Sequence, residues 1–429
     1  MPSPHASTSE PLLPGQEFVP VILGGDRLGY SLARSFHMAY GYRTVVVSRM
    51  VGGAIAHSPL IVHQQISSLE DPEALVTTLR DLAPRIGSRK LLLLATTDHV
   101  VSVVARVRDR LEDLYLVPYS DHELIDRLTR KEHFAQVCQE LDIPHPATVV
   151  YDLAEHADST PQTRAAVDAM TFPIIAKPSN AEAYAGVAFE GKRKVHSPAD
   201  RAELDDLLDK LYHAGYRDKF ILQDVIPGDD QGMRILTCYS DRNGLVRFAS
   251  YGQVLLEEHS PDTVGFPAAI LTQTNHEVVG QATRLLEHVG WRGYANFDLK
   301  LDPRTGKIVF FELNPRLGGT SFYITAAGHN TVRWYVDEYV HGEDLSRVDP
   351  LEASEEHIFT AIPLRLLTRY VTEPATKAKV RRLIKAGDVT NPLFYSAERH
   401  PRRWAWIIAN QANYVRKYRR HYPEPKALV

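Results

Sequence analysis

The sequence is poor in cysteine, lacks long apolar runs and has no strong excess of charge of one sign. Only two of its 429 residues are cysteines, Cys138 and Cys238, and they lie far apart in the chain. They exclude a disulfide framework and a cysteine metal site, and they fit a reducing, cytoplasmic environment. No apolar stretch approaches the ~20 residues that a membrane-spanning helix needs. A formal net charge of −4 gives no support to nucleic-acid binding by the chain as a whole.

The composition is otherwise that of a globular protein, with 44% hydrophobic and 24% charged residues. The length suffices for two or three packed domains. Residues 1–17 are rich in proline and serine and lack an apolar core. We therefore expect a disordered tail there rather than a signal peptide.

The N-terminal part alternates between strand-like apolar runs and a helical pattern. Residues 18–23, 44–48 and 90–95 have the pattern of buried strands, and residues 30–40 that of a helix. This alternation predicts an α/β fold with an open parallel sheet. The glycine-rich turn that begins at Gly24 lacks the G-x-G-x-x-G spacing, and no clear acidic residue follows the second strand, which disfavours a dinucleotide site. It favours a helix N-terminus placed beside a small anionic substrate.

Three oxygen-bearing side chains surround a turn in the second half of the chain. Asp298 precedes the turn at residues 302–306, and Glu312 and Asn314 follow it within an apolar run. A short antiparallel pair would bring Asp298 next to Glu312, while Glu312 and Asn314 share one strand face. Carboxylate and amide oxygens suit Mg²⁺, and Arg316 beyond them can bind an anion. The alternative is a surface hairpin with solvated acids, which the apolar flanks disfavour.

A lysine interrupts the apolar strand pattern at residues 172–178. Lys177 therefore either lies at a strand edge in water or points into a cleft towards an anion. The small-residue segment 179–187 is predicted to be a loop that folds over phosphates with its backbone N–H groups. Upstream, residues 121–141 are predicted to form one helix, which ends before Pro144.

Taken in order, these parts resemble a known family. Its markers are Lys131, Lys177, the hinge Gln223-Asp224-Val225-Ile226, Asp298, Glu312, Asn314 and Arg316. Their order and spacing are similar to the ATP-grasp fold, whose members activate a carboxylate with ATP and join it to an amine. Within that superfamily the chain resembles the D-aspartate ligase group from about residue 17 to about residue 422. The stretches that carry this likeness are residues 18–24, 33–36, 226–234 and 295–298.

The resemblance implies a role for each residue of the site. Lys131 and Lys177 would hold the α- and β-phosphates of ATP, and Arg316, Arg234 and Lys177 would form the catalytic set around the transferred phosphoryl group and the acyl-phosphate. The remaining roles fall to two groups: Gln223, Asp224, Val225 and Ile226 at the adenine with Asp229 or Asp230 at the ribose, and Asp298, Glu312 and Asn314 around Mg²⁺, or Mn²⁺ in its place.

The resemblance also implies a domain order and a reaction. A pre-ATP-grasp α/β domain would span residues 18–120, a linker helix and central lid 121–240, a C-terminal subdomain with the metal site 241–363, and a basic helical extension 364–429. The implied reaction attaches D-aspartate to the lysine side chain of a nucleotide-linked peptidoglycan stem-peptide precursor. A ligase for another amino acid or peptide is one alternative. An ATP-grasp kinase or carboxylase using bicarbonate is another, although no biotin carrier domain is evident. A non-catalytic nucleotide-binding protein that docks on membranes is a third, and the full set of metal ligands and lysines argues against it.

The last segment, residues 364–429, is strongly basic. It contains 15 lysines and arginines against 4 aspartates and glutamates, a local net charge of +11. Apolar residues fall at helical spacing within it, namely Trp404, Ile407, Ile408, Val415 and Tyr418. Either this stripe docks a helix on the core while its charges are solvated, or the positive charge attracts the acidic acceptor or touches anionic lipid.

Overall fold

The computed structural model describes residues 12–424, apart from residues 88, 157–159, 180 and 194, and the chain divides into two compact units. The first unit contains the chain up to Ile125, Met233–Asn296 and the chain from Asn314 onward. The second contains Asp126–Gly232 and Phe297–Leu313. Three elements contribute residues to both units: α4 (His122–Thr129), β12 (Gly293–Leu301) and β13 (Ile308–Asn314). The finer domain limits expected from the sequence stay predictions.

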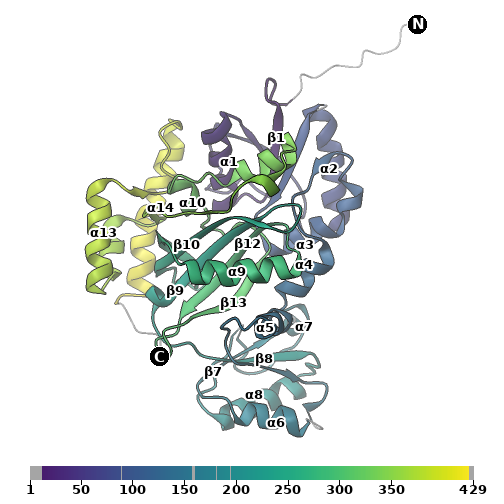
Figure 1. The fold of residues 1–429 in the computed structure, drawn as a ribbon, viewed down its shortest axis with the longest axis vertical. Coiled ribbons are helices and arrows are strands. Elements are labelled where there is room, and N and C mark those ends of the chain that lie inside the picture. Colours follow the sequence, from purple (N-terminus) through teal and green to yellow (C-terminus); the bar gives the residue numbers. More distant parts are fainter. Residues whose placement is uncertain (1–11, 88, 157–159, 180, 194, 425–429) are drawn as a thin grey trace. The chain divides into compact units, whose positions relative to one another are not determined.

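The first unit begins with the expected open parallel sheet, whose strand order is β3-β2-β1-β4-β5 (Figure 1). All six residues of β1 are buried, as is usual for a strand in the middle of a parallel sheet. The three predicted strands are confirmed as β1, β2 and β4, whereas β3 and β5 were not expected from the sequence. The elements are β1 (Phe18–Leu23), α1 (Arg27–Tyr40), β2 (Thr44–Ser48), β3 (Ile61–Gln65), α2 (Pro72–Ile86), β4 (Lys90–Ala95), α3 (Asp98–Arg106) and β5 (Tyr115–Leu116).

The turn between β1 and α1 is held by local chemistry and by a close approach to β4. The side chain of Asp26 caps α1 by accepting a hydrogen bond from the Gly29 backbone N–H at 2.8 Å. Gly24 has a φ of +128°, and a Cβ placed on it would lie 1.9 Å from Oγ1 of Thr96. Glycine is therefore required there, because any side chain would separate this turn from the end of β4.

A second sheet in the first unit has the order β9-β10-β11-β15-β16, with β14 paired to β10. Strands β9 and β10 are antiparallel and are joined by an Asn-Gly turn, in which Gly244 has a φ of +81°. The remaining elements of this unit are β9 (Met233–Ser240), β10 (Val246–Glu257), β11 (Pro267–Gln273), α9 (His276–Val289), α10 (Phe322–Ala326), α11 (Val332–Tyr335), β14 (Leu351–Glu352), β15 (Ile358–Thr360), α12 (Leu364–Tyr370), α13 (Pro374–Ala386), β16 (Val389–Thr390) and α14 (Pro401–His421).

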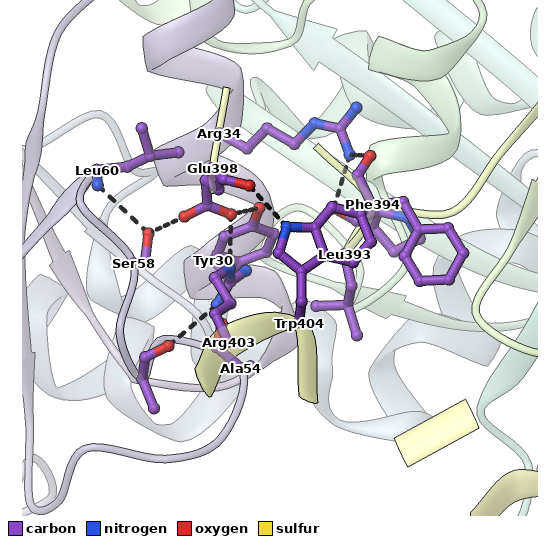
Figure 2. A network of polar contacts seen from close by, with 12 residues as sticks. Tyr30, Arg34, Ala54, Ser58, Leu60, Leu393, Phe394, Glu398, Arg403 and Trp404 are labelled. Atoms are coloured by element: carbon purple, nitrogen blue, oxygen red, sulfur yellow. Dashed lines mark hydrogen bonds and ion pairs between the residues drawn. The ribbon is translucent and has the colours of Figure 1, made fainter. Parts of the chain in front are cut away.

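A buried polar network ties the C-terminal segment to α1 (Figure 2). The carboxylate of Glu398 accepts hydrogen bonds from the hydroxyls of Tyr30, at 2.5 Å, and Ser58, and from Nε of Arg403 at 2.6 Å. The side chains of Glu398 and Arg403 are 1% and 0% exposed. The Arg403 guanidinium also lies 4.1 Å from the ring centre of Tyr30, a cation–π contact. Arg403, one of the charges of the basic C-terminal segment, therefore forms a buried ion pair instead of lying in solvent.

The helix α14 only partly follows the apolar stripe expected from the sequence. Ile407 and Tyr418 are buried as expected, but Ile408 is 65% exposed, so its assignment to the docked face is wrong. The ring of Trp406, outside the predicted stripe, packs closely on Gly53. The apolar periodicity of α14 did not predict which side chains are buried, because the segments that pack against this helix are distant in the sequence.

The expected N-terminal tail falls partly outside the described residues, which begin at residue 12. Leu13 is 6% exposed, and the backbone N–H of Leu12 donates to the carbonyl of Arg85 at 2.9 Å. The side chain of Gln16 exchanges hydrogen bonds with the backbone of Arg43. Residues 12–17 are therefore packed on the first unit rather than disordered.

The second unit contains a three-stranded antiparallel sheet with the order β6-β8-β7, and α6 and α8 lie together on one of its faces (Figure 1). Leucines of α8 pack with Val167 of α6 and with the sheet in one apolar core. Its elements are α5 (Lys131–Glu140), β6 (Thr148–Asp152), α6 (Pro161–Asp168), β7 (Ile174–Pro178), α7 (Ala181–Ala185), α8 (Arg201–His213) and β8 (Lys219–Asp224).

Two local predictions for this part of the chain are wrong. The helix predicted over residues 121–141 is broken into α4 and α5, because Arg130 adopts an extended conformation with φ −81° and ψ 124°. No glycine or proline marks that break. The loop predicted over residues 179–187 contains the short helix α7, in keeping with the helix propensity of its alanines. Residue 180 of that segment lies outside the described residues.

Across the described part of the chain, every helix is too short or too polar to traverse a bilayer.

Candidate active site

The hairpin expected around the acidic residues is present in the second unit. The turn between β12 and β13 is closed by the Gly306 N–H, which donates to the carbonyl of Asp302 at 2.8 Å, and Gly306 has a φ of +71°. This geometry places the side chain of Asp298 within hydrogen-bonding reach of Glu312. Two carboxylates thus meet at one point, as the sequence predicted.

A lysine from α5 approaches the same point. The Nζ of Lys131, the first residue of α5, lies 2.7 Å from Oε2 of Glu312, and both side chains are partly exposed. Burial by itself raises the pKa of Glu312, but the charge and hydrogen bond of Lys131 outweigh it and hold the pKa at about 2. Glu312 is therefore an ionised carboxylate at neutral pH.

Lys177 completes this group from β7. Its ammonium donates to Oε1 of Gln223 at 3.0 Å, and the amide of Gln223 in turn donates to the hydroxyl of Thr148 at 3.1 Å. Burial is the main reason that the pKa of Lys177 falls to about 8; the nearby Lys131 ammonium lowers it further, while Glu312 opposes the change. The ammonium groups of Lys131 and Lys177 thus lie near the carboxylate of Glu312, and an anionic ligand would favour the charged form of the buried Lys177.

The hinge after β8 is held mainly through its backbone. The side chain of Gln223 is buried. That of Asp224 is half-buried, and this burial raises the pKa of its carboxyl group. The buried ammonium of Lys300 binds the carbonyls of Ile226 and Gly228, at 2.7 and 3.1 Å. The backbone directly after Val225 is thus held in place by Lys300, and an adenine contact by this segment stays a prediction.

The two acids expected at the ribose differ in environment. Asp229 closes its own turn by accepting hydrogen bonds from the backbone and side chain of Gln231, at 3.1 and 3.3 Å. Asp230 is 3% exposed. Asp229 therefore has a turn-forming role in the structure, and a ribose contact by either residue stays a prediction.

Three further predicted residues, Arg234, Asn314 and Arg316, lie in the first unit. Arg234 is on β9. Burial raises the pKa of Tyr251, and the nearby positive charge of Arg234 opposes this change. The guanidinium of Arg316 donates to Oδ2 of Asp98 at 2.8 Å and to the carbonyl of Leu317 at 3.0 Å. Asp98 is the first residue of α3, directly after β4. Arg316 is thus oriented at the carboxyl edge of the parallel sheet, where open α/β sheets bind ligands.

The segment after Arg316 is fixed by an asparagine. The Nδ2 of Asn314 donates to the carbonyl of Asn296 at 3.3 Å, and the side chain of Asn296 accepts from Thr237 at 2.9 Å. A Cβ on Gly318 would lie 2.8 Å from Oδ1 of Asn296. Glycine at this position lets the backbone beyond Arg316 approach Asn296 closely.

Sequence reasoning missed three partners of the site. Asp98 follows a predicted strand and could have been found from its place at the strand end. Lys300 shares the alternation of β12 with Asp298, which was a usable signal. Glu132 accepts hydrogen bonds from Ser179 at 3.2 and 3.1 Å, and its neighbour Lys131 was the only hint.

The donors present suit a hard divalent cation. Asp298 and Glu312 offer carboxylate oxygens that converge, and Asn314 offers an amide oxygen at the end of the same strand. Mg²⁺ takes such oxygen ligands and usually shares them with substrate phosphates, which the two lysines would also bind. The chemistry of the donor set therefore fits such an ion, while in this structure the Lys131 ammonium, 2.7 Å from Glu312, balances that carboxylate.

Comparisons with known proteins show the family to which the chain is related. Residues 241–328 match the family described as carbamoyl-phosphate synthase L chain, ATP binding domain. A D-aspartate ligase from Enterococcus faecium (strain Aus0004) is 30% identical over 412 residues, which covers 95% of this chain and 97% of that relative.

Solved structures of low sequence identity share the fold. The L-amino acid ligase from Bacillus licheniformis has a TM-score of 0.53 and 17% identity, covering 78% of each chain. The biotin carboxylase domain of 2-oxoglutarate carboxylase from Hydrogenobacter thermophilus, solved with MgADP, ADP and bicarbonate, has a TM-score of 0.56 and 14% identity, covering 80% of this chain and 74% of that one. These likenesses confirm the fold expected from the sequence.

Proposed function

Because this chain belongs to the ATP-grasp ligases, in the carboxylate–amine group that includes D-aspartate ligase, we propose that it joins D-aspartate to the lysine side chain of a peptidoglycan stem-peptide precursor. The chain is an ATP-dependent ligase that forms a C–N bond. The observation that carries the choice of substrate is the 30% identity to D-aspartate ligase over 95% of the chain.

The proposed ATP site uses the cluster of the second unit. Lys131 and Lys177 bind the phosphates as point charges, and the burial of Lys177, which is the main reason that its pKa falls to about 8, favours its pairing with an anion. Gln223, with the hinge backbone of residues 224–226, faces the adenine, and Asp229 or Asp230 faces the ribose. When ATP enters, Lys131 exchanges its contact with Glu312 for one with phosphate, which frees that carboxylate for a cation.

Asp298, Glu312 and Asn314 would hold Mg²⁺, or Mn²⁺ in its place. The ion would neutralise the phosphate oxygens and polarise the phosphorus for attack. The protein's own part is to keep the carboxylates ionised and close together, and the approach of Lys131 to Glu312 supports this by holding the pKa of Glu312 at about 2.

The reaction follows from these charges. A carboxylate oxygen of the amino acid attacks the γ-phosphorus, and the bond to the β,γ-bridging oxygen breaks, which leaves ADP and an acyl-phosphate. The lysine amine of the acceptor then attacks the acyl carbon, loses a proton and expels phosphate. Arg234 and Arg316 stabilise the charge on the transferred group, and Asp98 positions Arg316.

The test measures ADP release by the full-length enzyme with ATP and Mg²⁺. D-aspartate together with a lysine-bearing stem-peptide precursor should stimulate ADP release more than L-aspartate or other D-amino acids do. The matched control is Glu312→Gln, which should abolish stimulation by every acid. Stimulation by a different acid, with none by D-aspartate, would keep the ligase class and remove the substrate assignment.

A further inference from the structure

Three segments far apart in sequence meet at the carboxyl edge of β1 and β2. Gly53, in the segment after β2, packs against the ring of Trp406 on α14. The side chain of Arg27, directly after the turn that follows β1, lies 3.2 Å from Glu258 and 3.2 Å from the hydroxyl of Tyr414, also on α14. The C-terminal helix therefore covers the edge at which parallel α/β sheets bind ligands.

An open groove of about 630 Å³ runs along α14 beside this edge. Among the described residues, its lining is formed by Trp406, Ala409, Asn410, Ala412, Asn413 and Arg416. The positions recur every three or four residues, so they share one helix face, and they span ~15 Å along the axis at 1.5 Å per residue. The small side chains of Ala409 and Ala412 leave space in the middle of the groove, between a tryptophan at one end and an arginine at the other.

The chemistry of the lining changes along the groove. The half-buried indole of Trp406 offers a flat apolar surface on which a planar ring can stack. One and two turns further along, Asn410 and Asn413 offer amides that both donate and accept hydrogen bonds. The guanidinium of Arg416 donates to Oδ1 of Asn413 at 2.7 Å, which orients its planar fork at the far end. This order of ring surface, amides and cation matches a nucleotide read from base to phosphate.

The surrounding charge has the sign that a phosphate needs. Lys417 and the exposed Arg420 follow Arg416 on the same helix, within a segment of net charge +11. The carboxylate at this edge, Glu258, is 5% exposed and is paired with Arg27, so it does not oppose an anion in the groove. Charge and shape thus select a diphosphate over a neutral or cationic group.

We propose that the α14 groove binds the nucleoside-diphosphate end of the amine acceptor, with the base on Trp406, the amides of Asn410 and Asn413 at its polar edge, and the diphosphate at Arg416. This inference rests on the proposed function, since it gives a place to a nucleotide-linked acceptor. The groove then acts as an anchor for the acceptor, and its binding energy is used to hold the acceptor amine in position.

An anionic membrane is the competing occupant, since Ile408 and Met50 are 65% and 77% exposed. A lipid surface would be bound by a convex apolar ridge with a basic border. The central polar groups of the groove are amides, which would lose hydrogen bonds in contact with acyl chains. The nucleotide is therefore the better fit, and lipid binding becomes an outcome of the test.

The experiment uses the full-length protein with its ATP site saturated by a non-hydrolysable ATP analogue and Mg²⁺, and titrates uridine diphosphate by calorimetry. Arg416→Gln should raise the Kd for uridine diphosphate about tenfold, the scale of one charge-assisted hydrogen bond. Arg381→Gln, an exposed arginine on α13 outside the groove, is the matched control and should leave the Kd unchanged. Asn410→Ala should weaken binding without altering net charge, which separates a specific site from general attraction.

Two results would overturn the assignment. One is uridine diphosphate binding that is absent or identical in wild type and Arg416→Gln. The other is co-sedimentation with phosphatidylglycerol vesicles that depends on Arg416 while uridine diphosphate binding does not. The proposed function is tested separately, by ADP release. If D-aspartate stimulates ADP release but uridine diphosphate does not bind, only the proposed groove site is refuted. If uridine diphosphate binds as expected but no acid stimulates ADP release, the proposed substrate of the ligase is refuted and the nucleotide site in the groove stands.

Discussion

Replacing Glu398 by Gln should destabilise the first unit severely, although this residue is remote from the cluster around Glu312 in the sequence. Glu398 is 1% exposed and accepts hydrogen bonds from Tyr30, Ser58 and Arg403 (Figure 2). The variant keeps the size of the side chain but leaves the guanidinium of Arg403, 0% exposed, without its counter-charge. Removing one partner of a buried ion pair costs about 3–5 kcal/mol.

The assay is urea unfolding of the full-length protein followed by circular dichroism, with hydrogen exchange of α14 as a local readout. Glu73→Gln is the matched control, because Glu73 forms an exposed ion pair with Arg110 and its loss should leave the midpoint unchanged. The double variant Glu398→Leu with Arg403→Met removes both charges and should be more stable than Glu398→Gln.

The prediction is wrong if the free energy of unfolding of Glu398→Gln lies within about 1 kcal/mol of that of wild type, which is the scale of a surface ion pair. The prediction is also contradicted if the double variant loses as much stability as the single variants Glu398→Leu and Arg403→Met added together, because the cost would then come from lost packing rather than from an uncompensated charge.

Further predictions concern the site and the second unit. Glu312→Gln should lower turnover at least ~10²-fold with folding intact, and chelation of divalent ions should abolish activity in wild type; near-normal turnover would refute the metal assignment. Lys177→Met should weaken ATP binding about tenfold while the melting temperature without nucleotide stays similar, and the opposite pattern would make Lys177 structural. Asp98→Asn should lower kcat with little change in the KM for ATP, because it only positions Arg316; a proportional rise in that KM would contradict this. Burial lowers the pKa of His196, so unfolding takes up a proton and stability falls as the pH drops below ~6.5, which differential scanning should show and His196→Gln should flatten.

The features that the sequence determined have local causes. The apolar run of β1, the helix α9 with its cap at Asn275 and its end at Gly290, and the Asp302–Gly306 turn all follow from neighbouring residues. The spacing of Asp298 and Glu312 about that turn made their meeting predictable, since a hairpin fixes which residues face each other. The family resemblance, confirmed by the 30% identity, rested on motifs of the same local kind.

The tertiary structure decided what depends on residues distant in sequence. Arg403 appeared as one more charge of a basic helix, but Glu398 and the hydroxyls of Tyr30 and Ser58 make it part of the core. Arg316 lies 218 residues from Asp98, its orienting partner. The break at Arg130 and the exposure of Ile408 left no local signal either. Periodicity records only which face of a segment is apolar, whereas burial and ion pairing depend on which other segment packs against that face, and that is settled only when the whole chain folds.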